Sequence, residues 1–124
     1  MNNCIFCNLS EDRIVNEYKN FYIIRDLYPV SNLHSLVIPK RHVVSYFECN
    51  QDEYDEIPII LNTQKTELKL TDGSITGFNI GMNIGEDAGQ TVFHFHIHII
   101  PRRKGDVKNP KGGIRGVISG KQKY

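Results

Sequence analysis

Short stretches in which apolar and polar residues alternate predict that much of this chain folds as β-strands. Residues 14–26 carry β-branched and aromatic side chains on both sides of a turn at Lys19–Asn20, so we expect two strands there, the second closed by Asp26. Residues 35–38 are apolar and end at Pro39, because proline cannot continue the hydrogen bonding of a central strand. They give a third strand.

Residues 77–85 alternate strictly between large apolar residues and small or polar ones. One face of this predicted strand lies on the core, and the other carries only glycine and the two asparagines, Asn79 and Asn83. Because glycine weakens a strand, its repetition predicts that a ligand or another backbone approaches that face closely. The expected core-facing residues are Phe78, Ile80, Met82 and Ile84.

One long helix is predicted between the strands, beginning near residue 51. Asn50 and Glu53 have the spacing of a capping box, and the helix should end at Asp72–Gly73. Pro58 lies inside the pattern, so we expect it to kink the helix or to move its start further along the chain. The apolar residues at helical spacing are Tyr54, Ile57, Leu61 and Leu68.

The run from Gln90 to Pro101 combines strand alternation with chemistry, because three of the five histidines occupy alternate positions in it. As a strand, it would place these histidines on one face and bury the apolar residues between them on the other. An imidazole has a pKa of roughly 6.5, so three side by side are hard to explain as structure alone, although a histidine-rich polar face is the alternative. The histidines are His94, His96 and His98, and the expected core residues are Phe93, Phe95, Ile97 and Ile99.

Length and composition predict a single domain over residues 1–124 that needs no disulfides, with 40% hydrophobic and 23% charged residues. No apolar run approaches the roughly 20 residues of a membrane span, and the N-terminus does not resemble an export signal, so we expect a cytoplasmic protein. Residues 102–124 hold eight Lys or Arg against Asp106 alone. This basic C-terminal segment is either anion-binding or a flexible, solubilising end.

Three cysteines are an odd number for a disulfide framework. Cys4 and Cys7 have the spacing of a metal or redox pair, and two such thiolates can share a tetrahedral zinc if two further ligands come from elsewhere in the chain. Cys49 is expected to be an ordinary buried thiol. By themselves the two N-terminal cysteines make half a site.

The run from Gln90 to Pro101 matches the His-φ-His-φ-His-φ-φ signature of the histidine triad (HIT) superfamily, where φ is apolar. Residues 36–40, flanked by His34 and His42, resemble its second hallmark. The likeness is greatest to the Fhit-like and bacterial diadenosine tetraphosphate hydrolase-like branches. It implies an α+β fold in which a five-stranded antiparallel sheet carries one long and one short helix, with the sheets of two chains joined across a homodimer.

The resemblance also implies roles at matching positions. His96 corresponds to the nucleophile that attacks the α-phosphorus, His98 to the residue that braces it, and His34 to an imidazole supporting both. Gln90 and Thr91 would bind phosphate oxygens, with Gln90 in the catalytic set. Ribose would be held by Asp26, phosphate also by Asn83, and the nucleobase by Phe6, Leu9, Ile24 and Leu27, for which an ordinary core role is the alternative.

Members of this family that keep the N-terminal cysteine pair take two further zinc ligands from histidines. The matching set here is Cys4, Cys7, His42 and His94. Four protein ligands leave no open position, so the implied zinc is structural. Catalytic metal binding by His94 and His96 together is a separate alternative. We expect no organic cofactor, and no nucleic-acid or membrane partner.

The expected function is a nucleotidyl hydrolase that cleaves dinucleoside polyphosphates of the Ap4A or Ap3A type at the α-phosphorus, releasing AMP. The alternatives are a Hint-like adenosine phosphoramidase and a nucleotide-binding signalling protein without catalysis. Thr91 stands where Hint-type enzymes usually have serine, and the chain contains no tryptophan. Cations follow the triad from Arg102 onward, which favours a substrate that extends beyond its α-phosphate.

Overall fold

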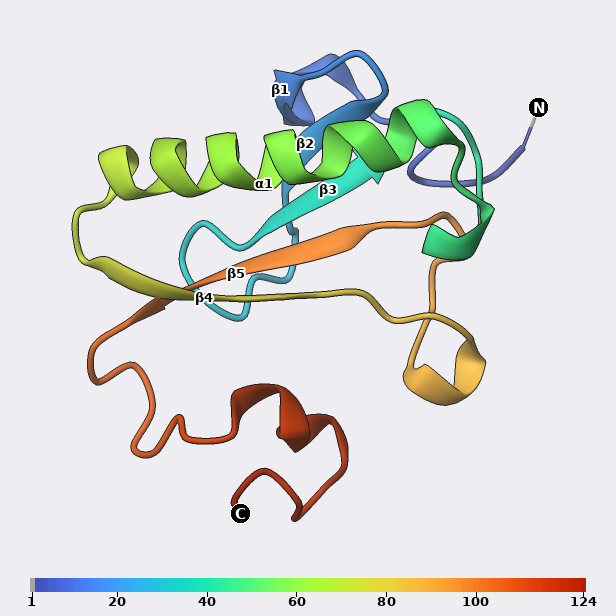
Figure 1. Cartoon of the computed structure of the whole chain (residues 1–124). Coiled ribbons are helices and arrows are strands. Elements are labelled where there is room, and N and C mark those ends of the chain that lie inside the picture. The colour runs from blue at the N-terminus through green and yellow to red at the C-terminus, as the bar shows by residue number, and fades with distance from the viewer. Residues whose placement is uncertain (1) are drawn as a thin grey trace.

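Five strands, each antiparallel to its neighbours, form one sheet in the order β1-β2-β3-β5-β4. This computed structural model describes residues 2–124. Within these residues a single α-helix, α1 (Gln51–Thr71), lies across one face of the sheet (Figure 1). The predicted α+β class is therefore confirmed. The strands are β1 (Ile14–Glu17), β2 (Phe21–Arg25), β3 (Ser35–Pro39), β4 (Ile75–Gly81) and β5 (Ile97–Arg103).

Helix α1 begins where the sequence predicts, because its capping box forms. The Asn50 side chain accepts from the Glu53 amide at 2.9 Å, and the Glu53 carboxylate accepts from the Asn50 amide at 2.8 Å. Pro58 neither delays nor interrupts the helix. It lies on the exposed side, where the carbonyl that loses an N–H partner can bond to water. The implied short α-helix is absent from residues 2–124, which contain only 3-10 turns besides α1.

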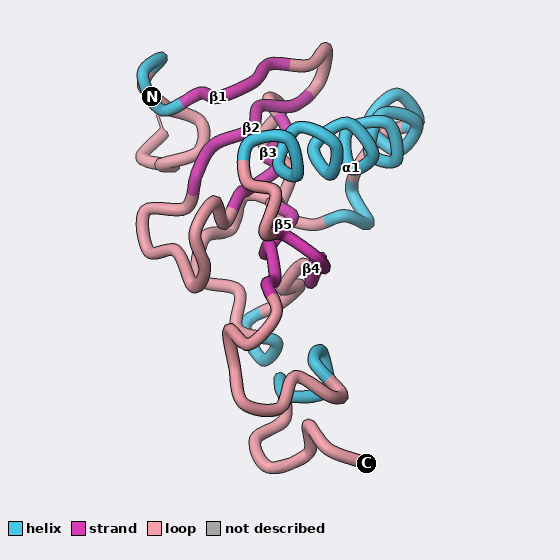
Figure 2. Tube along the Cα trace, turned by 90° about the vertical axis from the view of Figure 1, so that its left-hand side faces the viewer, coloured by secondary structure: helices cyan, strands magenta, loops and turns pink. Residues whose placement is uncertain are grey.

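The two faces of the sheet carry separate apolar clusters. Under α1, the side chains of β2, β3 and β5 pack with the helix around Phe21, Val37 and Ile99. On the opposite face, Ile24 and Leu36 pack against the N-terminal segment, which brings Phe6 onto the sheet. Figure 2 shows α1 and the N-terminal segment on the two sides of the sheet. The second face is the one that His98 shares with Leu36.

The histidine run is a strand only in its second half. We predicted a strand over the run from Gln90 to Pro101, but β5 begins at Ile97, and Phe93 is 47% exposed rather than buried. The neighbouring strands explain this, because β4 ends opposite His98 and β3 pairs no further than Ile97. Before that point Phe95 donates to the carbonyl of Val43 at 2.7 Å, so tertiary contacts replace the ladder.

Strand β4 is shorter than predicted and lies at the edge of the sheet. It ends at Gly81 rather than at residue 85, and Ile80 is 42% exposed although we expected it in the core. An edge strand is covered by neighbours on one side only, which explains this exposure. Phe78 and Met82 pack against the core as expected. The C-terminal segment lies beyond β4 in both views (Figures 1 and 2).

None of the helices in residues 2–124 is long and apolar enough to span a membrane.

Candidate functional site

Histidines converge on a pocket of about 390 Å³ on the sheet face opposite α1. It lies where the end of β2, the start of β5 and the loop before β5 meet. This volume suits a small ligand. Six of the residues that line it are Phe6, Asp26, His34, Thr91, His96 and His98.

A chain of hydrogen bonds fixes the protons on two of these histidines. The backbone amide of Val30 donates to Nδ1 of His34 at 3.1 Å, so neutral His34 carries its proton on Nε2. That Nε2 lies 2.9 Å from Nδ1 of His98 and 3.4 Å from the carboxylate of Asp26. Donation from His34 to Nδ1 leaves the proton of His98 on Nε2, directed away from His34.

His96 has the opposite tautomer. Its Nδ1 lies 2.9 Å from the backbone carbonyl of His94, which can only accept, so Nδ1 carries the proton. The lone pair of His96 is therefore on Nε2. Phe6 packs against the imidazole with ring centroids 5.1 Å apart, and His98 packs edge-on at 5.2 Å. In the neutral imidazole this arrangement presents the lone pair of Nε2, in a fixed orientation, beside the pocket.

Burial keeps the supporting histidines neutral. It lowers the pKa of His98 to about 4, and proximity to His96 and His34 acts in the same direction. Burial also lowers the pKa of His34, while the charge of Asp26 opposes that shift. Both imidazoles are therefore uncharged near pH 7, so they act as hydrogen-bonding groups rather than as cations.

We expected Gln90 to bind phosphate oxygens at the site, but its side chain is bonded to backbone groups instead. Its side-chain oxygen accepts from the amide of Gly85 at 2.9 Å, and its side-chain nitrogen donates to the carbonyls of Val44 and Val92 at 2.8 and 3.2 Å. The residue is buried and is not among those lining the pocket. Its polar groups thus brace the loop before β5 instead of facing a ligand.

The other predicted nucleotide contacts divide into two groups. Asp26, Asn83, Thr91, Phe6 and Leu27 line the pocket. Leu9 and Ile24 do not line it, since they pack in the apolar cluster behind Phe6. For these two, the ordinary core role that the sequence left open is the one the structure gives.

Two features of the pocket were missed from the sequence. The Val30 amide orients His34, and a backbone group of an exposed loop leaves no signal in the sequence. Arg13 lines the pocket from the turn before β1. The sequence around Arg13 could have indicated it only by placing a cation directly before an apolar strand. Ile5, Tyr28, Leu36 and Val92 complete the walls.

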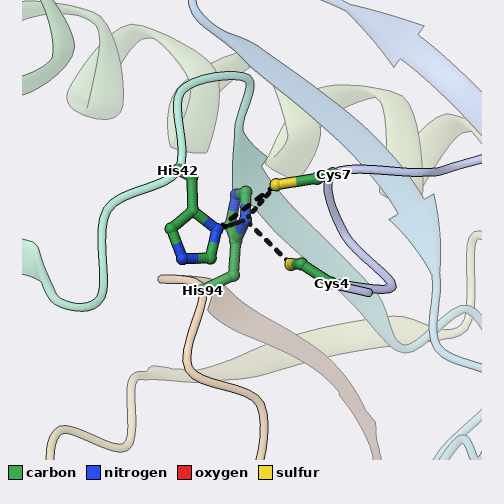
Figure 3. Close-up of side chains that lie close together, drawn as sticks. All are labelled: Cys4, Cys7, His42 and His94. Atoms are coloured by element: carbon green, nitrogen blue, oxygen red, sulfur yellow. Dashed lines mark hydrogen bonds between the residues drawn. The ribbon is translucent and has the colours of Figure 1, made fainter. Parts of the chain in front are cut away.

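A second cluster joins the N-terminus to the histidine run (Figure 3). Nδ1 of His94 lies 3.3 Å from Sγ of Cys4 and 3.5 Å from Sγ of Cys7, while Nδ1 of His42 lies 3.2 Å from Sγ of Cys7 and 3.1 Å from Nδ1 of His94. All four ligand atoms lie within 4.8 Å of one another. Zinc bonds of roughly 2.0–2.3 Å give tetrahedral edges of about 3.3–3.8 Å, so the cluster has nearly the size of a zinc site.

His94 is oriented as a metal ligand. It is fully buried, and its Nε2 lies 2.8 Å from the carbonyl of Pro39, so that nitrogen carries the proton and Nδ1 offers its lone pair to the two cysteines. Burial lowers the pKa of His94, which favours the neutral form that a metal needs. Among residues 2–124, no cluster of three or more possible metal ligands contains both His94 and His96, so the structure offers no site for the catalytic metal that these two histidines could have shared.

Asp26, His34 and His98 also lie within metal-ligand distance of one another. Their atoms already form a hydrogen-bonded chain, and the second ring nitrogen of His34 accepts from Val30. This donor set fits a proton network better than a metal. The cysteine-containing cluster is the stronger metal candidate because thiolates have high affinity for zinc.

Two solved structures share this fold. A zinc-bound histidine triad family protein from Mycobacterium smegmatis is 32% identical, with a TM-score of 0.76, over 84% of this chain and 78% of that one. The diadenosine triphosphate hydrolase of Plasmodium falciparum is 27% identical, with a TM-score of 0.74, over 82% and 68% of the two chains. Both likenesses cover more than four fifths of this chain.

Curated relatives and a family model agree with these structures. A HIT-like protein of Mycoplasma pneumoniae is 35% identical over 82% of this chain and 72% of its own length. An adenylylsulfatase of Arabidopsis thaliana is 35% identical over 85% of this chain and 55% of its own length. The model of the HIT domain matches residues 9–105, which include both histidine hallmarks. The chain therefore belongs to the HIT family.

Proposed function

We propose that this HIT protein hydrolyses dinucleoside polyphosphates at the α-phosphorus through a nucleotidyl-His96 intermediate. The observation that carries the proposal is the free Nε2 of His96. Its Nδ1–H is bound to the His94 carbonyl, which fixes the ring, and Nε2 is left as the nucleophilic nitrogen. Nucleophilic catalysis needs such an oriented, unprotonated group, whereas simple binding does not.

The reaction has two displacements. Nε2 of His96 attacks the α-phosphorus, forming a nitrogen–phosphorus bond as the bond to the bridging oxygen breaks, and the remaining nucleotide leaves as a phosphate anion. Water then attacks the same phosphorus and gives up a proton to solvent, and the nitrogen–phosphorus bond breaks with its electron pair returning to Nε2. The nucleoside monophosphate, which is AMP from Ap3A or Ap4A, is released with His96 restored. A phosphate anion is a stable leaving group, so the first step needs little help from a general acid.

The residues around His96 supply orientation and charge stabilisation. Nε2–H of His98, fixed by His34, can donate to a phosphate oxygen, and the Thr91 hydroxyl and the Asn83 amide lie on the same pocket. Asp26 lines the same pocket, where it can accept from the ribose hydroxyls. One of its oxygens already accepts from the amide of Tyr28 at 2.9 Å, which holds the carboxylate in place.

Support for a polyphosphate substrate comes from the likeness to the Plasmodium diadenosine triphosphate hydrolase and from Thr91. The cations after the triad support it less than the sequence suggested. Arg102 is bound to Asp106 and Asn79, and Arg103 to Asp72. The likeness to an adenylylsulfatase favours an adenylylated sulfate or phosphoramidate as the second candidate substrate class.

We also propose a structural zinc ion on Cys4, Cys7, His42 and His94. The sizes and orientations described above support it, as does the zinc-bound relative from Mycobacterium smegmatis. The ion would link the N-terminal segment to His94, which lies two residues before His96. Its contribution would be rigidity around the nucleophile, because four protein ligands leave no position for substrate.

A homodimer is the last part of this proposal. The outer edge of β4 pairs with no other strand in residues 2–124, and it carries few blocking charges. Such an edge can pair with its copy in a second chain and continue the sheet. Sedimentation or light scattering of the purified protein would measure the mass directly.

The His96→Ala variant tests the proposed reaction. Turnover should disappear, because the covalent step is removed. Affinity for AMP should change by less than about tenfold, because only one of several phosphate contacts is lost. The His98→Ala variant should keep a measurable covalent step. Persistent turnover by the His96 variant would exclude the nucleophilic role.

A further inference from the structure

Arg13 stands apart from the other groups of the proposed nucleotide pocket, because among residues 2–124 it is the only arginine or lysine side chain that lines it. The 3-10 turn Glu11–Arg13 delivers it directly before β1. Its side chain is half-buried, and one guanidinium nitrogen donates to the carbonyl of Arg25 at 3.1 Å. In the part of the chain that the structure describes, Arg13 forms no ion pair. Most of its donors therefore remain available to a ligand.

The register of the sheet places the backbone of Arg13 at the opposite end of the pocket from His98. Directly paired residues form a row across four strands, running from His98 through Leu36 and Ile24 to Ile14. Three strand spacings of about 4.8 Å separate its ends by roughly 14 Å. Arg13 immediately precedes Ile14. Between the two ends the pocket wall is apolar, with Phe6, Leu27 and Leu36 among its residues, and it suits the flat face of a base.

The polar groups of the pocket, taken from His98 through Asp26 to Arg13, have the order of the phosphate, ribose and base of a nucleotide. His98 lies at one end, and Asp26 lies beside the connecting imidazole, 3.4 Å from His34. Arg25, whose carbonyl holds Arg13, directly precedes Asp26. A ligand with its phosphate at the histidines and its ribose at Asp26 thus directs its base toward the guanidinium.

We propose that Arg13 makes this site selective for guanine-type bases. A guanidinium presents two parallel N–H donors, and guanine presents two adjacent acceptors, O6 and N7. Adenine offers N7 but carries an amino group in place of O6, so one donor of Arg13 would face another donor. The inference rests on the proposed function for the placement of phosphate and ribose.

Equilibrium binding of three mononucleotides tests the inference without requiring hydrolysis. Calorimetry on the full chain would compare GMP, IMP and AMP. IMP is included because it keeps O6 and N7 but lacks the 2-amino group of guanine. A bidentate arginine–base pair discriminates by roughly 5- to 150-fold. GMP and IMP should therefore both bind at least about fivefold more tightly than AMP.

Two variants separate base reading from a general effect of charge. Arg13→Gln removes the cation and the fork, so GMP and IMP should lose more affinity than AMP, and the three affinities should come within about twofold of one another. Arg13→Lys keeps the charge but lacks the planar fork, so it should lose the discrimination as well. A thermal melt of each variant identifies any loss of folding.

Several results would overturn the inference. Equal binding of GMP and AMP by the unsubstituted protein would exclude base reading and leave the proposed reaction intact. Retained discrimination in Arg13→Lys, or an equal loss for all three nucleotides in Arg13→Gln, would assign Arg13 to charge alone. Failure of all three to bind would instead remove the nucleotide site itself, and the proposed function with it.

Discussion

Substitution of Cys7 by serine tests the proposed zinc site most sharply, because the chain provides a matched control. Cys7 and Cys49 are both half-buried thiols, but only Cys7 lies in the cluster with His42 and His94. Burial raises the pKa of Cys49 to about 11, so that thiol stays protonated and is a poor metal ligand. The Cys7→Ser variant should lose zinc, and Cys49→Ser should retain it.

The expected loss of stability follows from linkage. A ligand present at a hundred times its Kd stabilises the folded state by about 2.7 kcal/mol. An entropy of unfolding of about 2.1 cal/mol/K per residue gives a 124-residue chain roughly 0.26 kcal/mol/K. Loss of the metal should therefore lower the Tm by about 10 °C. Cys49→Ser should cost about 1 kcal/mol, or roughly 4 °C, through its partly buried side chain.

Two measurements on the same samples are needed. Elemental analysis should give about one zinc per chain for the unsubstituted protein and for Cys49→Ser, and almost none for Cys7→Ser. Melting with and without a chelator should lower the Tm of the first two proteins and leave that of Cys7→Ser unchanged. Full zinc content in Cys7→Ser, or a Tm that no chelator alters in any of the three, would refute the site.

Three further predictions concern pH, the C-terminal segment and the substrate. The pKa of His98 is about 4 in the folded protein and about 6.5 in the unfolded chain. Between these pH values only the unfolded chain binds a proton at His98, so the free energy of unfolding falls as the pH drops from 6.5 toward 4. Allowing for partial exposure of His98, we expect denaturant titrations to show a loss of about 1–2 kcal/mol in the free energy of unfolding, and a smaller loss in His98→Asn. An equal loss in the variant and the unsubstituted protein would assign the acid sensitivity to other groups. Deletion after Pro110 should lower activity on polyphosphates and weaken its salt dependence, and an unchanged salt profile would make this segment a solubilising end. Diadenosine tri- or tetraphosphate should have a higher kcat/KM than adenosine phosphoramidate at one ionic strength, and a tenfold preference for the phosphoramidate would reverse the substrate assignment.

Local signals in the sequence predicted much of the fold. The capping box of Asn50 and Glu53 placed the start of α1, and the turn at Lys19–Asn20 placed β1 and β2. Prediction failed where pairing with distant strands decides the outcome. His94 and His96 alternate like strand residues, but β4 ends opposite His98, and β3 pairs no further than Ile97 although it continues to Pro39.

The site was predicted from residue types and family resemblance, and its hydrogen bonding was not. The side chain of Gln90 binds three backbone groups that the folded loop brings together. Nothing in the local sequence indicates that these groups need partners. The same holds for the Val30 amide, which sets the tautomers of His34 and His98 through a loop conformation.

The central claim, a covalent bond to His96, is tested most directly by quenching the protein during turnover of a dinucleoside polyphosphate and locating the modification by tandem mass spectrometry. The quench should be alkaline, because the nitrogen–phosphorus bond is labile in acid. Since His94, His96 and His98 fall in one peptide, fragmentation must separate the three positions. We expect one nucleotidyl group on His96, and none in His96→Ala. A group on His98, or active turnover with no modified histidine, would contradict the account.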